Sequence, residues 1–412
     1  MGPRSVASTL PQDLLPQMRA LAETVWRLVR RDRSQSAVHL ISRVLGELDL
    51  SGQESKAQSK EQRAYLLNLR GVILAQRGQG DESLADLLSA HRELPQWPVP
   101  LYNLGLAYKH SRRWSESAEM LEQATASLRL KGGRLASVLG QGTGLQRAVG
   151  WNLGIALTAI GRLAAAREAL SGFNVSTPRA TGGDLGLAQL SLPTQGPYSI
   201  ERVWVQRIDP VRARILSVVR YGAPCQFGDI VLVDNSSYQT GFSDGLQSNE
   251  AEEGEAEEGQ NGLVFLDALE SAGYVLHVVQ GGAATPGQAM ALTERMREAG
   301  LHIEVWSLTM RLPGSNQSSS EPSSDERGAP LCAGLVLPMG GNQATGTRWP
   351  DADSPISHLQ GVPVAEHAVS AINLASNELS VPLYAPTLLA AAGDELGAAR
   401  HRKALRRGLV SR

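Results

Sequence analysis

The stretch "LYNLGLAYKHSRRWSESAEMLEQA" (101–124) decides the fold of the N-terminal half. Its Gly105 lies inside an apolar run, and the same kind of run recurs as "LRGVIL" (69–74) and "NLGIAL" (152–157). A glycine in a helix interior costs about 1 kcal/mol relative to alanine. Its threefold recurrence therefore indicates positions where two helices approach too closely for a Cβ.

The first two glycine-centred runs are 34 residues apart, from Gly71 to Gly105. A 34-residue period is typical of a helix–turn–helix repeat. Small and large side chains keep the same spacing in the two copies: Leu74 with Tyr108, Ser83 with Ser117, Leu87 with Leu121, and Ala90 with Ala124. The pattern predicts stacked helix pairs.

This pattern resembles the tetratricopeptide repeat (TPR). The small and large signature residues of that family are matched here by Gly105, Tyr108, Ser117, Leu121 and Ala124. A third unit, "WNLGIALTAIGRLAAAREALSGF", matches through Gly154 but begins 49 residues after the second. The extra fifteen residues fall around "LRLKGGRLASVLGQGTG". The resemblance covers about 60–173 well and 14–59 loosely.

The resemblance implies an all-α TPR-like solenoid over 1–173, with a groove that binds a peptide or protein. Family positions place a partner-binding groove at Asn68, Val72, Gln76, Tyr102, Leu106, Lys109, His110, Trp151 and Ile155. They place repeat packing at Gly71, Gly105, Tyr108, Leu121, Ala124 and Gly154. One TPR subclass grips a chaperone's C-terminal carboxylate. Its lysine positions hold Asn68 and Ala148 here, so we do not expect that partner.

The second half has another pattern, and we expect a multidomain protein whose C-terminal region is α/β or α+β. Residues 174–200 have linker composition, and 201–312 carry short strand signals around one helix. An acidic, disordered insertion is expected at 244–261, and a Ser/Pro-rich linker at 313–330. Residues 331–412 predict a strand followed by helices that pack on the α/β domain.

Composition limits the class of partner and the compartment. The net charge is −2, with +8 over residues 1–180 and −10 over the remainder. We therefore expect a protein partner and no nucleic acid. The two cysteines form no disulfide or zinc motif, and the N-terminus lacks the apolar segment of a signal peptide. No apolar run is long enough for a membrane span. We expect a cytoplasmic protein.

No catalytic motif is present, so we expect a non-enzymatic interaction or scaffold protein without cofactor or metal. Cys225 lies in a turn near Asp229, but no base accompanies it in the sequence. The alternative is a ligand-binding or enzymatic α/β domain within 201–380 that the TPR array localises or regulates. A concave pocket with converging polar groups in that half would favour the alternative.

Overall fold

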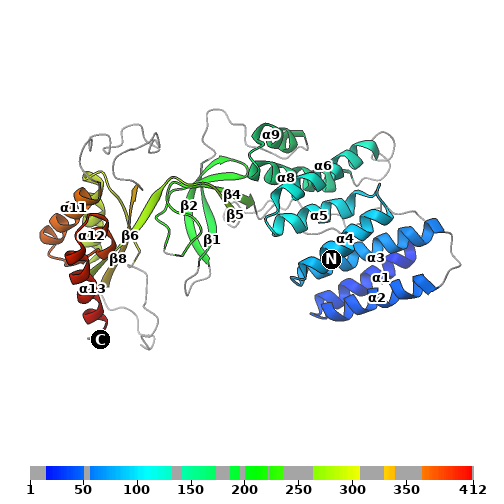
Figure 1. Ribbon diagram of the computed structural model, residues 1–412, viewed down its shortest axis with the longest axis horizontal. Coiled ribbons are helices and arrows are strands. Elements are labelled where there is room, and N and C mark those ends of the chain that lie inside the picture. The colour runs from blue at the N-terminus through cyan, green and yellow to red at the C-terminus, as the bar shows by residue number, and fades with distance from the viewer. Residues whose placement is uncertain are drawn as a thin grey trace. The chain divides into compact units, whose positions relative to one another are not determined.

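The computed structural model describes residues 15–50, 56–131, 142–172, 186–194, 200–220, 222–235, 263–306, 329–338 and 364–410. A helical N-terminal region is followed by a strand-rich region (Figure 1). The chain divides into two compact units. One comprises Met1–Gly183, Asp209–Val211 and Leu232–Asp267, and the other comprises Asp184–Ile208, Arg212–Val231 and Ala268–Arg412. The predicted insertion at 244–261 lies outside the described residues, as does the predicted linker at 313–330 except for Ala329 and Pro330, which begin a strand.

The helices of the first unit pack on one another in chain order (Figure 1). In addition, α3 contacts α5, and α5 contacts α8. The first helices of three successive pairs therefore share one side of this unit. The contact between α5 and α8 forms although fifteen extra residues separate their pairs. The described helices of this region are α1 (Leu15–Arg30), α2 (Ser34–Leu50), α3 (Lys56–Gln76), α4 (Gly80–Glu93), α5 (Pro98–His110), α6 (Trp114–Lys131), α8 (Gly142–Ala159) and α9 (Leu163–Gly172).

The three glycines face a leucine of the next helix. A Cβ on Gly71 would lie 2.8 Å from the Leu87 Cγ, and Cβ atoms on Gly105 and Gly154 would each lie 2.5 Å from the Cγ of Leu121 and Leu170. Each distance is shorter than van der Waals contact. Glycine therefore permits the close approach of the two helices in all three pairs.

Hydroxyl groups reinforce the first two of these contacts. Ser83 Oγ donates to the Gly71 carbonyl oxygen at 2.7 Å, and Ser117 Oγ donates to the Gly105 carbonyl oxygen at 2.8 Å. The other predicted packing residues fit this arrangement, since Leu121 and Ala124 are buried and Tyr108 is partly buried. The Arg113 guanidinium lies 4.6 Å from the centroid of the Tyr108 ring.

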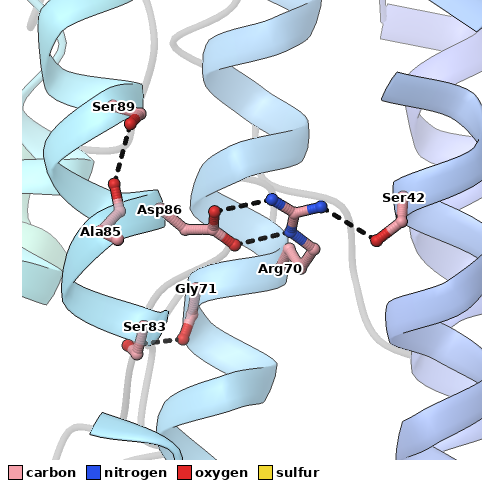
Figure 2. A network of polar contacts seen from close by, with 7 residues as sticks. All are labelled: Ser42, Arg70, Gly71, Ser83, Ala85, Asp86 and Ser89. Carbon is pink, nitrogen blue, oxygen red and sulfur yellow. Dashed lines mark hydrogen bonds and ion pairs between the residues drawn. The ribbon is translucent and has the colours of Figure 1, made fainter. Parts of the chain in front are cut away.

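Arg70 joins three helices on another side of the first pair, as Figure 2 shows. Its Nε and Nη2 donate to the two carboxylate oxygens of Asp86 at 2.6 and 2.7 Å, while Nη1 donates to Ser42 Oγ at 2.9 Å. The planar fork of arginine suits this two-bond contact. Arg70 thus connects α3 to both α4 and α2.

Five strands form a closed barrel, in the order β1 (Leu187–Pro193), β2 (Ile200–Asp209), β3 (Arg212–Ile215), β4 (Ile230–Asn235) and β5 (Leu263–Glu270). β1 and β2 are antiparallel, with Leu190 opposite Val203. β1 lies within 174–200, which composition predicts to be linker. The composition misleads here because this strand is only seven residues long and is bounded by glycine and proline.

The second sheet has the order β7-β8-β6-β9, formed by β6 (Tyr274–Ala284), β7 (His302–Val305), β8 (Ala329–Pro338) and β9 (Leu383–Tyr384). The helices of this region are α10 (Pro286–Glu298), α11 (Val364–Glu378), α12 (Pro386–Ala391) and α13 (Glu395–Val410). Residues from α10, α11 and α12 share a hydrophobic core with the sheet. The residues expected to form one domain, 201–312, are therefore distributed between the barrel and this sheet, because strand pairing and not sequence proximity groups them.

α10 begins at a capping box. Gln288 N donates to Thr285 Oγ1, and the Gln288 side-chain oxygen accepts from Thr285 N at 2.8 Å. The helix is followed by Gly300 with φ of 72°.

Among the described helices of the chain, none combines the length and the apolar composition needed to cross a bilayer.

Candidate functional site

The side of the first unit formed by α3, α5 and α8 carries the residues predicted to bind a partner. Two of these, Gln76 and His110, are exposed. The other seven are buried: Asn68, Val72, Tyr102, Leu106, Lys109, Trp151 and Ile155. These seven side chains are therefore packed inside the protein in this structure, and their role in binding a partner stays a prediction.

Polar side chains run across this side from helix to helix. Asn103 Nδ2 of α5 donates to Asn68 Oδ1 of α3 at 2.8 Å. Lys109 Nζ of α5 donates to Asn152 Oδ1 of α8 at 2.7 Å, and Asn152 Nδ2 donates to the Ala148 carbonyl oxygen at 2.9 Å. All these side chains are buried, where polar groups require a partner. The Asn152 amide thus holds the Lys109 ammonium in place, while Asn103 and Asn68 join α5 to α3.

A carboxylate from β4 completes the cluster. Asp234 Oδ2 accepts from Lys109 Nζ at 2.6 Å, and Asp234 Oδ1 accepts from Trp151 Nε1 at 2.8 Å. The Lys109 and Asp234 side chains are only 8% and 3% exposed. Both carboxylate oxygens of Asp234 therefore have a partner. One oxygen forms a buried ion pair with the Lys109 ammonium, and the other accepts a hydrogen bond from the neutral Trp151 indole. We call Lys109, Trp151, Asn152 and Asp234 the carboxylate cluster.

A second carboxylate from the same unit meets the turn between α5 and α6. Trp114 Nε1 donates to Asp267 Oδ2 at 2.8 Å, and Arg112 Nη1 lies 3.3 Å from Asp267 Oδ1. The Arg112 guanidinium also lies 5.9 Å from the centroid of the Phe265 ring. β4 and β5 thus each present an aspartate to a basic residue and a tryptophan of the helical region.

Arg112 reaches Asp267 from an unusual backbone position. Its φ is 54°, in the left-handed region that favours glycine. The corresponding turns between α3 and α4 and between α8 and α9 place Gly78 and Gly161 in that conformation, with φ of 75° and 76°. An arginine in this position adds a side chain where the other two turns have none.

His110 is adjacent to the cluster and is affected by it. Partial burial lowers the pKa of its imidazole, and the Lys109 ammonium lowers it further, while the Asp234 carboxylate acts in the opposite direction. The net direction is downward, so His110 is neutral at pH 7.

The remaining candidate chemistry is weak in the described residues. Burial, reinforced by Asp229, raises the pKa of the Cys225 thiol to about 12, so this residue is a neutral thiol at pH 7. Asp229 itself accepts from Gln226 N and Ala272 N, both at 2.7 Å. Within the part of the chain that the structure describes, no three His, Cys, Asp or Glu residues are grouped as metal ligands would be.

The sequence does not predict roles for Asp234, Asp267, Arg112 or Trp114. One signal is present for Arg112, which occupies the turn position that holds Gly78 one repeat earlier. Asp234 has only the weak signal of an acidic residue directly after a run of β-branched and apolar residues.

Comparison with known proteins identifies no family, because the sequence matches no protein-family model and no curated protein is significantly similar to it. The function must therefore be inferred from the geometry of the carboxylate cluster.

Proposed function

We propose that this protein is a non-enzymatic interaction protein whose TPR-like helical region binds an extended segment carrying a carboxylate. The single observation that carries the proposal is the buried carboxylate cluster, in which Lys109 and Trp151 hold Asp234. The repeated glycine–leucine contacts in three helix pairs support the assignment to the TPR type.

The residues of the cluster have the chemistry of a carboxylate receptor. Lys109 supplies the charge, Trp151 donates to the second oxygen, and Asn152 orients the ammonium. A hydrogen bond to a charged group contributes about 1.5–3 kcal/mol. This receptor therefore discriminates an aspartate or glutamate from its amide by roughly tenfold or more.

In this chain the receptor holds the protein's own segment. β4 supplies Asp234, and β5 supplies Asp267 to the neighbouring turn. An intramolecular ligand has a high effective concentration at its own receptor. A partner protein with a similar acidic segment must compete with the chain's own segment, so binding depends on how firmly Asp234 is held.

A labelled peptide that copies residues 228–238, "GDIVLVDNSSY", tests this recognition on the full chain. Fluorescence anisotropy would compare wild type with Asp234→Asn, which preserves the shape but removes the charge from the intramolecular ligand. We expect the variant to bind the peptide about tenfold more tightly than wild type. The matched control is the same peptide with asparagine at the position of Asp234, which should bind weakly to both proteins.

Lys109→Met in the Asp234→Asn background should abolish the gain, because the ammonium that attracts the peptide carboxylate is then missing. The proposal fails if the aspartate and asparagine peptides bind the variant equally. It also fails if the methionine substitution leaves peptide affinity unchanged while circular dichroism shows an intact helical region.

A further inference from the structure

The outward side of strands β1, β2 and β3 in the second unit has an unusual composition. Burial alternates along these strands, with Leu190, Leu192, Val203, Val205, Ala213 and Ile215 turned inward. Side chains of the opposite parity therefore face outward. Among them is Trp204, which is 51% exposed. A tryptophan is a costly residue to leave half in water, because it has a large apolar ring.

Two amides and an arginine surround Trp204 on this side. The register places Gln189 of β1 directly opposite Trp204, and Gln206 follows two residues later on the same face of β2. Arg202 precedes Trp204 by two residues on that face and is opposite Ser191. Side chains at such positions are within reach of one another.

β3 adds further positive charge. Leu216 N donates to the Trp204 carbonyl oxygen at 2.9 Å, so the end of β3 runs beside the middle of β2. Arg214 and Arg212 alternate with the inward Ala213 and Ile215 and so face outward. Every charged residue at an outward position of these three described strands is an arginine.

Three of these residues are not committed to structural contacts within the described part of the chain. In the described residues, the side chains of Arg202, Trp204 and Arg214 make no hydrogen bond, ion pair or ring contact. Other arginines of the chain are committed, since Arg70 binds Asp86 and Arg220 lies 3.5 Å from Glu201. Glu201 has the inward parity of β2 and belongs to that ion pair, so it does not neutralise the outward arginines.

We propose that this surface, formed by Gln189, Arg202, Trp204, Gln206 and Arg214, binds single-stranded nucleic acid. A base stacks on the exposed Trp204 ring, which every base can do because each has a flat π-face. The Gln189 and Gln206 amides offer hydrogen bonds to the base edge, and the Arg202 and Arg214 guanidinium groups bind the flanking phosphates.

Charge and shape together favour this ligand over an acidic peptide. The arginines attract either polyanion, but an exposed indole flanked by two amides matches a planar base with donors and acceptors at its edge. The net charge of −2 led us to expect no nucleic acid, yet that average includes acidic residues far from this surface in the sequence. Local charge, not the total, determines such binding.

Fluorescence anisotropy tests the proposal. Fluorescein-labelled oligo(U) and oligo(dT) are titrated with the full chain, and each is about ten nucleotides long to match a typical single-strand site. Trp204→Ala should weaken binding roughly ten- to hundredfold, since removal of a stacking ring has an effect of that size. Because Trp204 is exposed, this substitution should leave the circular dichroism spectrum and thermal stability unchanged. The matched control is Met290→Ala on α10, an accessible apolar side chain (72% exposed) that should not affect binding.

Salt dependence tests the role of the arginines. The double variant Arg202→Gln, Arg214→Gln should reduce the slope of log K against log salt by roughly 0.7 for each phosphate that an arginine no longer neutralises. Labelled poly-glutamate provides the acidic-peptide arm of the experiment. The proposal is overturned if no oligonucleotide binds, if Trp204→Ala binds like wild type, or if poly-glutamate binds as tightly as the oligonucleotides.

Discussion

The Lys109 ammonium lies 2.6 Å from a carboxylate oxygen of Asp234, a residue 125 positions further along the chain, and both side chains are almost excluded from water. Trp151 and Asn152 provide hydrogen-bond partners for this ion pair. The pair connects the helices of the first unit to β4. Removal of either charge would leave the other buried without compensation.

Lys109→Met should destabilise the first unit strongly. It leaves the Asp234 carboxylate buried beside the neutral Trp151 indole without its cationic partner, and removing one partner of a buried pair costs about 3–5 kcal/mol. Urea unfolding followed by far-ultraviolet circular dichroism would measure the loss. The double variant Lys109→Met, Asp234→Leu should recover most of it, because no charge then remains buried. If the double variant is less stable than Lys109→Met alone, the ion pair is not the source of the effect.

Gly105→Ala tests the close approach of α5 and α6. The added Cβ would lie 2.5 Å from Leu121 Cγ, so overpacking of about 1–3 kcal/mol should outweigh the gain in helix propensity. The matched control is Gly46→Ala in α2, where no atom lies within 4 Å of the new Cβ. This control should stabilise the protein by about 0.5–1 kcal/mol.

Thermal unfolding of both variants gives the comparison. Leu121→Ala in the Gly105→Ala background should relieve the clash. The double variant should therefore lose less stability than the sum of the losses of the two single variants. Equal stabilisation by Gly105→Ala and Gly46→Ala would contradict the close packing.

The Gly105–Leu121 contact could be predicted from sequence, whereas the Lys109–Asp234 contact could not. The helix-pair contact recurs at a 34-residue period, and small and large residues keep that period because each pair solves the same packing problem. Asp234 meets Lys109 through a strand outside the repeat, and no periodicity relates the two residues. The contact of Trp151 with Asp234 could not be predicted for the same reason, since a repeat pattern does not reveal which segment outside the repeat packs against it.

β1 illustrates a second limit. Its burial depends on pairing with β2 through residues such as Leu190 and Val203, and a seven-residue strand between glycine and proline has little signal of its own. The division of 201–312 between the barrel and the second sheet has the same origin, because β6 pairs with β8 across a long sequence separation. Short apolar runs predict that a strand exists but do not predict its neighbour.

Arg112 provides a test that separates backbone strain from side-chain contacts. Arg112→Gly relieves a left-handed conformation that costs about 1–2 kcal/mol, but it removes the contacts with Asp267 and Phe265. We expect these opposing effects to offset each other within about 1 kcal/mol, because an exposed ion pair contributes little.

Arg112→Ala is the matched variant, because it removes the same side-chain interactions without the conformational freedom of glycine. It should be less stable than Arg112→Gly by about 1 kcal/mol in urea unfolding. Equal stability of the alanine and glycine variants would show that the left-handed conformation imposes no strain.

Acidification should destabilise the second unit through His277, which is buried, and His302, which is partly buried. Burial lowers the pKa of His277 and of His302 below the ordinary value of 6.5. Between the lowered folded value and 6.5, the unfolded chain binds more protons than the folded chain, so stability falls as the pH falls. The loss should begin as the pH falls toward 6.5 and continue until the pH is below the lowered pKa of the folded state.

Two carboxyl groups act in the opposite direction at lower pH. Burial raises the pKa of Glu201 and of Glu304 above 4.5, and the neighbouring Glu201 charge raises that of Glu304 further. The folded state binds more protons than the unfolded state in that range, so acidification toward these raised values stabilises the fold. These two carboxyl groups should therefore offset part of the histidine effect at lower pH, before general acid unfolding begins.

Thermal unfolding at half-unit pH steps would trace this curve. His277→Gln removes one titrating group and retains a side chain that can bond to Thr387, whose Oγ1 lies 3.4 Å from His277 Nδ1. We expect this variant to lose less stability than wild type as the pH falls from neutral through the ordinary histidine pKa of 6.5. An unchanged pH slope in the variant would mean that His277 does not contribute, and a wild-type midpoint that rises on acidification from neutral pH would contradict the sign assigned to the histidines.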